Sequence, residues 1–82
     1  MKINIREMEA AADNASELLK ALANRHRLMI VCQLVAGERS VGELADALAI
    51  RDSTVSQHLA ILRKDGIVGA RREAQTIYYS IE

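Results

Sequence analysis

Hydrophobic residues recur every three or four positions through most of the chain, with polar residues between them. This spacing places the hydrophobic side chains on one face of an α-helix and therefore predicts amphipathic helices. Four such segments are present, and each is bounded by a Gly, Asn or Ser that favours a helix end. The helices are expected at about residues 6–22, 25–36, 41–48 and 53–65.

The first two predicted helices differ in how much of their surface is apolar. The first carries a stripe rich in Ala, including Ala11, Ala12 and Ala15, which allows another helix to approach closely. The second is apolar over most of its circumference, a pattern typical of a helix that is buried on several sides. Its main apolar face is formed by Leu28, Val31, Cys32 and Val35, and it is broadened by Met29, Ile30 and Leu34.

Capping residues mark where the predicted helices begin. Asn24 is expected to stop the first helix and to cap the second. Ser40 and Glu43 have the spacing of a capping box, in which a hydroxyl and a carboxylate satisfy exposed N–H groups reciprocally. Asp52 or Ser53 is expected to cap the fourth helix.

The periodicity changes after residue 66. Two short segments rich in β-branched and aromatic residues, 67–72 and 76–81, are typical of strands, and residues 73–75 join them as a hairpin. Helices followed by a β-hairpin, or wing, make the layout of a winged helix-turn-helix DNA-binding domain. The expected fold is thus mainly α with a small β-hairpin, in a single domain over residues 1–82 with the wing at about 67–81.

Charge is distributed unevenly along the chain. The net charge is zero, with 11 Lys and Arg against 11 Asp and Glu, so a role in nucleic-acid binding must rest on local charge. Between Arg51 and Arg72 there are five Lys or Arg against two Asp, a local net charge of +3, whereas residues 1–50 have a net charge of −1. The positive region covers the fourth helix and the start of the wing, where DNA would lie.

The fourth predicted helix has two distinct faces. Val55, Leu59 and Leu62 form its apolar line, so its small polar side chains are expected to face outward. Ser, Thr and Gln can hydrogen-bond base edges, and Arg and Lys of the helix and the wing can bind phosphate or a minor groove. The candidate DNA-binding residues are Arg51, Ser53, Thr54, Ser56, Gln57, His58, Arg63, Lys64, Arg71, Arg72 and Gln75.

Other classes of function are less well supported by the sequence. A polar helix face is often only a solvated face, and a winged helix can serve as a protein-interaction module that binds no operator. One Cys excludes an internal disulfide framework and a multi-cysteine metal site, and no segment approaches the roughly 20 apolar residues of a membrane span. We expect a cytoplasmic protein that is not an enzyme and that needs no metal or cofactor.

Several motifs together resemble the ArsR/SmtB family of bacterial repressors. They are residues 18–28, 40–44, 53–59 and 71–80, and the resemblance extends over nearly the whole chain from residue 16 onward. It implies a homodimer that binds an imperfect palindrome of operator DNA and releases it on a chemical signal. Family dimers pair mainly through the first helix and a last helix that follows the wing.

The sequence departs from the family pattern at three places. It stops at Glu82, just after the wing, so the last dimer helix is expected beyond this residue. Arg51 stands where relatives often have a small capping residue, which leaves the cap to its two successors. Ala74 occupies a position of the wing turn that is often Gly, so the hairpin tip is expected to be stiffer or differently turned.

The resemblance also bears on the chemical signal. Metal-sensing relatives carry a Cys-x-Cys type cluster on the third helix, and residues 41–48 contain no Cys. Cys32 resembles the second-helix cysteine of the BigR/SqrR branch, which senses sulfane sulfur with a partner cysteine on the last helix. Cys32 is therefore a candidate thiol sensor for reactive sulfur species, or else a small, inert core residue. The wing also resembles NolR-like members, which need no metal-binding cysteines.

Overall fold

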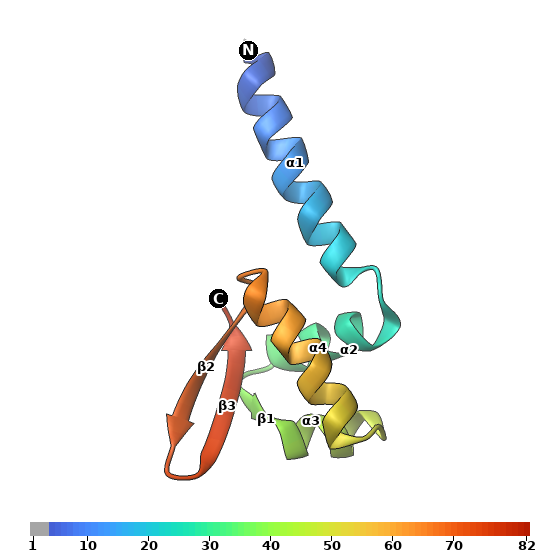
Figure 1. Ribbon diagram of the computed structural model, residues 1–82, viewed down its shortest axis with the longest axis vertical. Helices are drawn as coiled ribbons and strands as arrows, with labels where there is room; N and C mark the ends of the chain where they lie inside the picture. Colours follow the sequence, from blue (N-terminus) through green and yellow to red (C-terminus); the bar gives the residue numbers. More distant parts are fainter. Residues whose placement is uncertain (1–3) are drawn as a thin grey trace.

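The computed structural model describes residues 4–82 as four helices and a three-stranded antiparallel sheet (Figure 1). This is the winged helix-turn-helix that the sequence predicts, with a two-residue strand added before the third helix. The strand order in the sheet is β1-β3-β2. The elements are α1 Ile5–Leu22, α2 Arg25–Val35, β1 Arg39–Ser40, α3 Val41–Leu48, α4 Asp52–Lys64, β2 Val68–Glu73 and β3 Thr76–Ile81.

Two predicted helix starts are confirmed by side-chain hydrogen bonds. The Asn24 side chain accepts from the backbone N–H groups of His26 at 3.0 Å and Arg27 at 3.2 Å. At the start of α3, the Glu43 N–H donates to Ser40 Oγ at 3.2 Å, and the Ser40 N–H donates to Glu43 Oε1 at 3.0 Å. Each cap satisfies N–H groups that the first helical turn leaves unpaired.

The predicted cap of α4 is wrong. The helix begins at Asp52, its N-cap is Arg51, and no side chain caps it. Before it, Ala49 adopts a left-handed conformation with φ of 54°, which turns the chain sharply between α3 and α4. The Val55 N–H donates to the Arg51 carbonyl at 3.1 Å, so the hydrogen bonding of α4 already begins at Arg51.

One hydrophobic core lies between α2, α3, α4 and the sheet. The predicted apolar line of α4 is confirmed, since Val55, Leu59 and Leu62 are each fully buried at 0% exposure. Burying these aliphatic side chains supplies most of the favourable free energy of folding. The buried cluster consists of Ile30, Leu34, Leu44, Ala45, Val55, Leu59, Leu62 and Val68.

The predicted burial of α2 on several sides is wrong. This helix turns Ile30 and Leu34 toward the core, whereas Leu28 is 48% exposed, Val35 is 73% exposed and the thiol of Cys32 is also exposed. Cys32 is therefore not the core residue that the sequence offered as the alternative to a sensor, and its reactivity stays a prediction. Within residues 4–82, α2 contacts α1, α3, α4 and β3, and these contacts leave the face of Leu28, Cys32 and Val35 at the surface.

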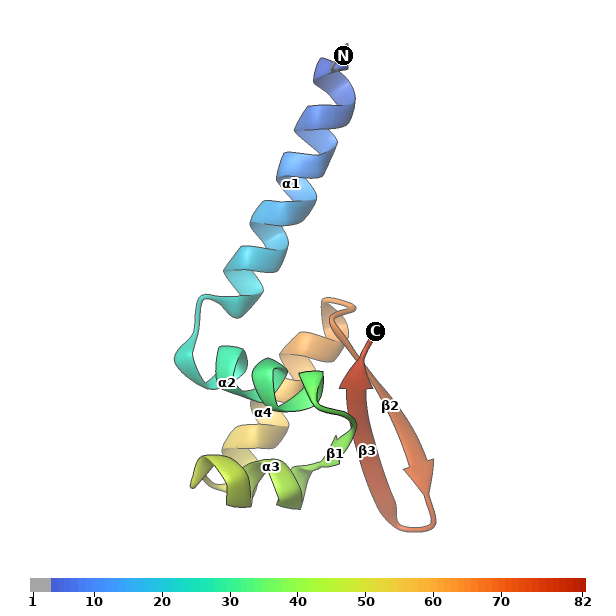
Figure 2. The ribbon, with the colours of Figure 1, turned by 180° about the vertical axis from the view of Figure 1, so that it is seen from behind.

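Helix α1 projects away from the rest of the molecule, as both ribbon views show (Figures 1 and 2). Ala21, near its last turn, is its one buried residue among those described. The Ala-rich stripe predicted for helix packing is therefore exposed in this chain. No helix among residues 4–82 combines the length and apolarity needed to cross a membrane.

The wing is a tight hairpin. Strands β2 and β3 pair from Val68 opposite Ile81 to Glu73 opposite Thr76, so the turn contains two residues instead of the predicted three. The first of them, Ala74, has a φ of 56°, the left-handed region that Gly adopts most readily. Strand β1, which the sequence did not predict, pairs Arg39 with Tyr79.

Candidate nucleic-acid interface

The outward face of α4 is polar and unobstructed among the described residues. Ser53, Ser56, Gln57 and Lys64 are exposed and lie opposite the buried line of the helix. Ala60 is also exposed and lies between them, because it follows Gln57 by three residues and Ser56 by four. Sequence reasoning missed Ala60 by searching for polar side chains, although its helical position alone would have placed it on this face.

Two of the candidate residues on α4 lie at the flank of this face. Thr54 and His58 are half-buried. The His58 ring contacts the His26 ring of α2 edge to face, with 5.5 Å between centroids, and Arg27 Nη1 lies 3.5 Å from His58 Nδ1. Burial, and then the neighbouring charges of Arg27 and His26, lower the pKa of His58 below its ordinary value. His58 thus faces α2, which argues against its expected outward role.

The start of α4, helix α3 and the tip of the hairpin lie at the same end of the molecule, opposite α1 (Figures 1 and 2). This arrangement lets one stretch of duplex DNA meet both the helix and the wing. A helix fits the major groove of B-DNA, and small polar side chains on it reach base edges. The start of α4 and the hairpin turn, which contains Gln75, are thus near each other in the fold.

Four candidate cations have no ionic partner among residues 4–82. Arg51 precedes α4, Arg63 and Lys64 end it, and Arg72 lies on the hairpin, all of them exposed. Exposed Lys and Arg at the edges of a docking face are suited to phosphate contacts, which supply sequence-independent affinity.

Arg71 differs from these four cations because carboxylates surround it. It forms an ion pair with Glu38, and its Nη1 donates to Glu73 Oε2 at 3.0 Å. Its guanidinium carbon lies 5.0 Å from the centroid of the Tyr78 ring. The hydrogen bonds to Glu38 and then to Glu73 raise the pKa of Arg71 well above its ordinary value, and the hydrogen bond from Arg71 lowers the pKa of Glu38. The predicted pair of wing arginines is thus chemically unequal.

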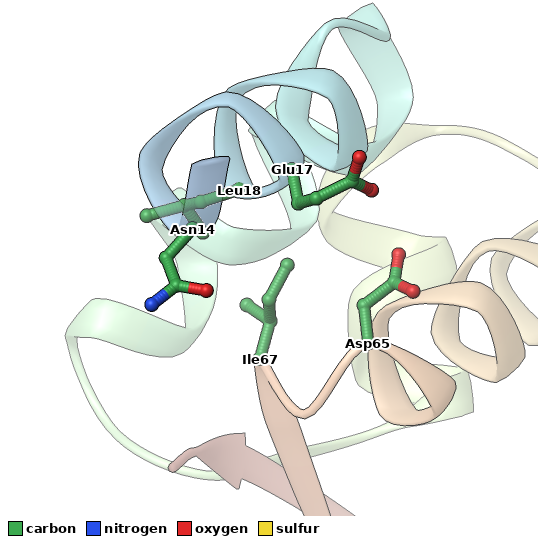
Figure 3. Close-up of a pocket in the computed structure, with 5 residues that line it drawn as sticks. All are labelled: Asn14, Glu17, Leu18, Asp65 and Ile67. Carbon is green, nitrogen blue, oxygen red and sulfur yellow. The ribbon is translucent and has the colours of Figure 1, made fainter. Parts of the chain in front are cut away.

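A pocket of about 390 Å³ lies between α1 and the connection from α4 to β2 (Figure 3). The carboxylates of Glu17 and Asp65 point toward each other across it, and Ile67 points into it (Figure 3). It is separate from the face formed by α4 and the wing tip. The residues that line it are Asn14, Glu17, Leu18, Asp65 and Ile67.

Known bacterial regulators are similar to this chain in sequence. The profile of a family described as "Bacterial regulatory protein, arsR family" matches residues 24–69, which include α2, β1, α3, α4 and the start of β2. The transcriptional activator HlyU of Vibrio cholerae is 51% identical over 96% of this chain and 73% of its own length. The biofilm growth-associated repressor of Agrobacterium fabrum is 49% identical over 98% of this chain and 68% of its own length.

Solved structures show the same arrangement of elements. Reduced HlyU from Vibrio cholerae superposes with a TM-score of 0.88 at 51% identity, covering 94% of this chain and 81% of that one. A homodimeric winged helix-turn-helix DNA-binding domain from Mycobacterium bovis, studied in solution, superposes with a TM-score of 0.79 at 38% identity. That superposition covers 99% of this chain and 75% of the other.

Proposed function

Because this chain belongs to the arsR family of bacterial regulatory proteins, we propose that it is a homodimeric repressor that binds palindromic operator DNA in the cytoplasm and is released by a chemical signal. The observation that carries this proposal is the exposed polar face of α4, a helix whose start lies at the same end of the molecule as the wing tip (Figure 1). Family membership establishes a DNA-binding regulator, and the operator, the repression and the signal are the proposed parts.

Base recognition is assigned to the middle of the exposed α4 face. The Gln57 amide has the donor and acceptor needed to bond an adenine bidentately, and Ser53 and Ser56 offer hydroxyls on either side of it. The Ala60 methyl group can contact a thymine methyl in the major groove. Arg51, Arg63, Lys64 and Arg72 are assigned to phosphates, and Gln75 at the wing tip to the adjoining minor groove.

Pairing of two chains is assigned to the outer face of α1. Ile5, Met8 and Leu19 lie on one side of this helix and are all at least 48% exposed, and the Ala-rich stripe runs between them. An apolar surface of this kind is costly to leave in water, and a second copy would cover it. The homodimeric relative from Mycobacterium bovis supports the pairing of two chains. A two-fold dimer presents two α4 helices, which favours a palindrome with half-sites one helical turn apart.

Repression follows from where such a dimer would bind. A dimer seated on promoter DNA blocks access to it, and one relative at 49% identity is named a repressor. Another relative, at 51% identity, is named an activator, so a reporter gene must determine whether this chain lowers or raises transcription. We expect deletion of the regulator to raise transcription from its own upstream promoter.

The signal is assigned to Cys32. Its thiol is free and exposed on α2, beside Leu28 and Val35, where a dissolved polysulfide can reach it. Modification at this surface acts on DNA binding if it favours a dimer arrangement in which the two α4 helices no longer match successive major grooves.

Fluorescence anisotropy tests the core of the proposal. The protein should bind its own upstream DNA more tightly than a scrambled duplex, and raising the salt concentration should weaken both interactions. Gln57→Ala should reduce the preference for the upstream DNA with little change in scrambled-DNA binding. Equal, salt-insensitive binding to both duplexes would overturn the proposal and favour a protein-interaction module.

The same titration tests the signal. Polysulfide should abolish DNA binding by the protein that carries Cys32, whereas the Cys32→Ser variant should still bind DNA. If both proteins bind equally well before and after polysulfide, Cys32 is not the sensor, and the DNA-binding proposal is unaffected.

A further inference from the structure

We propose that Glu38 and Arg71 form a latch that fixes the wing against the helix-turn-helix, so that Arg71 is a positioning residue for DNA binding and not a phosphate contact. The latch comprises Glu38, Arg71, Glu73 and Tyr78. This inference rests on the proposed DNA-binding function, but its structural part is testable without DNA.

The register of the sheet brings the latch residues to one face. Arg71 of β2 pairs with Tyr78 of β3, and Tyr78 in turn pairs with Ser40 of β1. Directly opposed residues in a sheet share a face, as do residues two apart on one strand. Glu73 therefore lies on the face of Arg71, and Glu38, two residues before Ser40, approaches the same face. The latch thus joins β2 and β3 to the segment that precedes β1.

The guanidinium of Arg71 is fully engaged by this arrangement. Its Nε donates to Glu38 Oε2 at 2.9 Å and to Glu38 Oε1 at 3.1 Å, and its Nη2 also donates to Glu38 Oε1. Its Nη1 donates to Glu73 Oε2. Each of the three nitrogens thus binds a carboxylate, and the planar group lies near the Tyr78 ring. Paired Arg–carboxylate bonds of this kind define direction as well as distance.

The bonds join parts of the chain that the sheet connects only weakly. Glu38 belongs to the segment between α2 and β1, whereas Arg71 lies on β2, which is separated from β1 by β3. Strand β1 has only two residues, so it offers the distal hairpin little support. The Glu38–Arg71 pair links β2 directly to the helical body across 33 positions of sequence. Its loss should free the wing to swing relative to α4.

Charge also argues against a phosphate contact by Arg71. With Glu38 and Glu73 bound to it, the cluster carries one more negative than positive charge. A phosphate would have to displace a carboxylate or approach a net negative surface. Arg72 is the opposite case, since it lies on the other face of β2 and has no ionic partner among residues 4–82. Within the wing, Arg71 thus positions the hairpin, whereas the adjacent Arg72 is available for a phosphate contact.

DNA titrations over a range of salt concentrations test this division. Glu38→Ala and Arg71→Ala should each weaken operator binding by about threefold to fivefold, a modest effect because the pair is exposed. The double variant should bind no more weakly than either single variant, because both remove one interaction. None of the three should change the salt dependence. Arg72→Ala should weaken binding and lower the salt slope by about one.

Two further variants separate the latch from a phosphate contact. Arg71→Lys keeps the positive charge but loses the planar guanidinium, whose several N–H groups bind Glu38 and Glu73 together. It should therefore behave like Arg71→Ala. Asp46→Asn removes an exposed carboxylate of α3 outside the latch, and it reports what loss of a negative charge alone does. The proposal is overturned if Glu38→Ala tightens binding more than Asp46→Asn does, or if Arg71→Lys binds like the unmodified protein while Arg71→Ala lowers the salt slope.

Amide hydrogen exchange of the free protein tests the latch without DNA. Glu38→Ala and Arg71→Ala should speed exchange in the wing, residues 68–81, and leave the core of α4 unchanged, whereas Arg72→Ala should change neither. Unchanged wing exchange in Glu38→Ala would overturn the latch even if the protein binds DNA. Faster wing exchange in a protein that binds no DNA would keep the latch and overturn the proposed function.

Discussion

Helices α4 and α1 both carry regular apolar stripes, yet one stripe is completely buried and the other is exposed. Leu59 of α4 is 0% exposed, whereas Leu19 of α1 is 67% exposed. The difference lies in what surrounds each helix, since α4 packs against α2, α3 and β2, while α1 extends away from them (Figure 1). An amphipathic pattern therefore shows that a face is suited to burial, but it does not identify the partner.

The largest expected effect is on the buried side of this comparison. Leu59→Ala should lower the free energy of unfolding by about 2–5 kcal/mol, because it removes buried methyl groups and leaves a cavity. Urea denaturation followed by circular dichroism measures it. Leu19→Ala is the matched control and should cost less than about 0.5 kcal/mol in dilute, monomeric protein. Equal losses in the two variants would mean that α1 is packed within a single chain.

For the exposed stripe of α1, a substitution is expected to prevent dimer formation and to leave folding intact. Leu19→Glu should shift the protein from dimer to monomer, because it places a charge on the proposed dimer face. Binding to a palindrome should weaken on the order of a hundredfold, since each half-site is then bound separately. Analytical ultracentrifugation and anisotropy measure the two effects. A Leu19→Glu protein that stays dimeric would show that α1 does not form the interface.

The starts of α3 and α4 extend the comparison to local interactions. Ser40→Ala should lower the free energy of unfolding by about 1 kcal/mol, because the Ser40 hydroxyl caps α3. Ser53→Ala should change it by less than about 0.5 kcal/mol, because no side chain caps α4. Urea denaturation of both variants measures the difference. A larger loss for Ser53→Ala would restore the cap that the sequence suggested.

The smallest expected effect concerns the flank of α4 that faces α2. The pKa of His58 is lower in the folded protein, so the unfolded chain binds more protons as the pH falls below about 6.5. Stability should therefore decrease as the pH falls from this value through the folded pKa, and it should be fully retained above it. Thermal unfolding between pH 5 and 8 measures the effect, and His58→Gln should flatten it. An unchanged pH profile in His58→Gln would assign the effect to another group.

Sequence reasoning predicted the elements well where the pattern is local. The Ser40–Glu43 capping box and the buried line of Val55, Leu59 and Leu62 depend on residues three or four positions apart, which a helix always brings together. It failed for β1, because the two residues Arg39 and Ser40 are too few to show a strand pattern. It also placed the cap of α4 too late, because Arg51 has no capping side chain and the helix begins after it without a side-chain cap.

The part of the candidate interface that depends on local spacing was also predicted from the sequence. The exposed positions of α4 follow from helical spacing alone, and they include Ser56 and Gln57. The inequality of Arg71 and Arg72 does not follow from spacing, because Glu38 reaches Arg71 from 33 residues away through the folded sheet. The inward position of His58 likewise depends on Arg27 and His26 of another helix.

The sequence by itself determined the four helices, the two strands of the hairpin and which side of α4 is polar. These properties depend on backbone preferences and on contacts within a few residues. Only the tertiary structure decided that Leu28 and Val35 of α2 face outward, that Arg71 is bound by carboxylates, and that the start of α4 and the wing tip share one end of the molecule. The physical reason is that burial and ion pairing depend on which distant segments meet, and a linear pattern of residues does not specify that meeting.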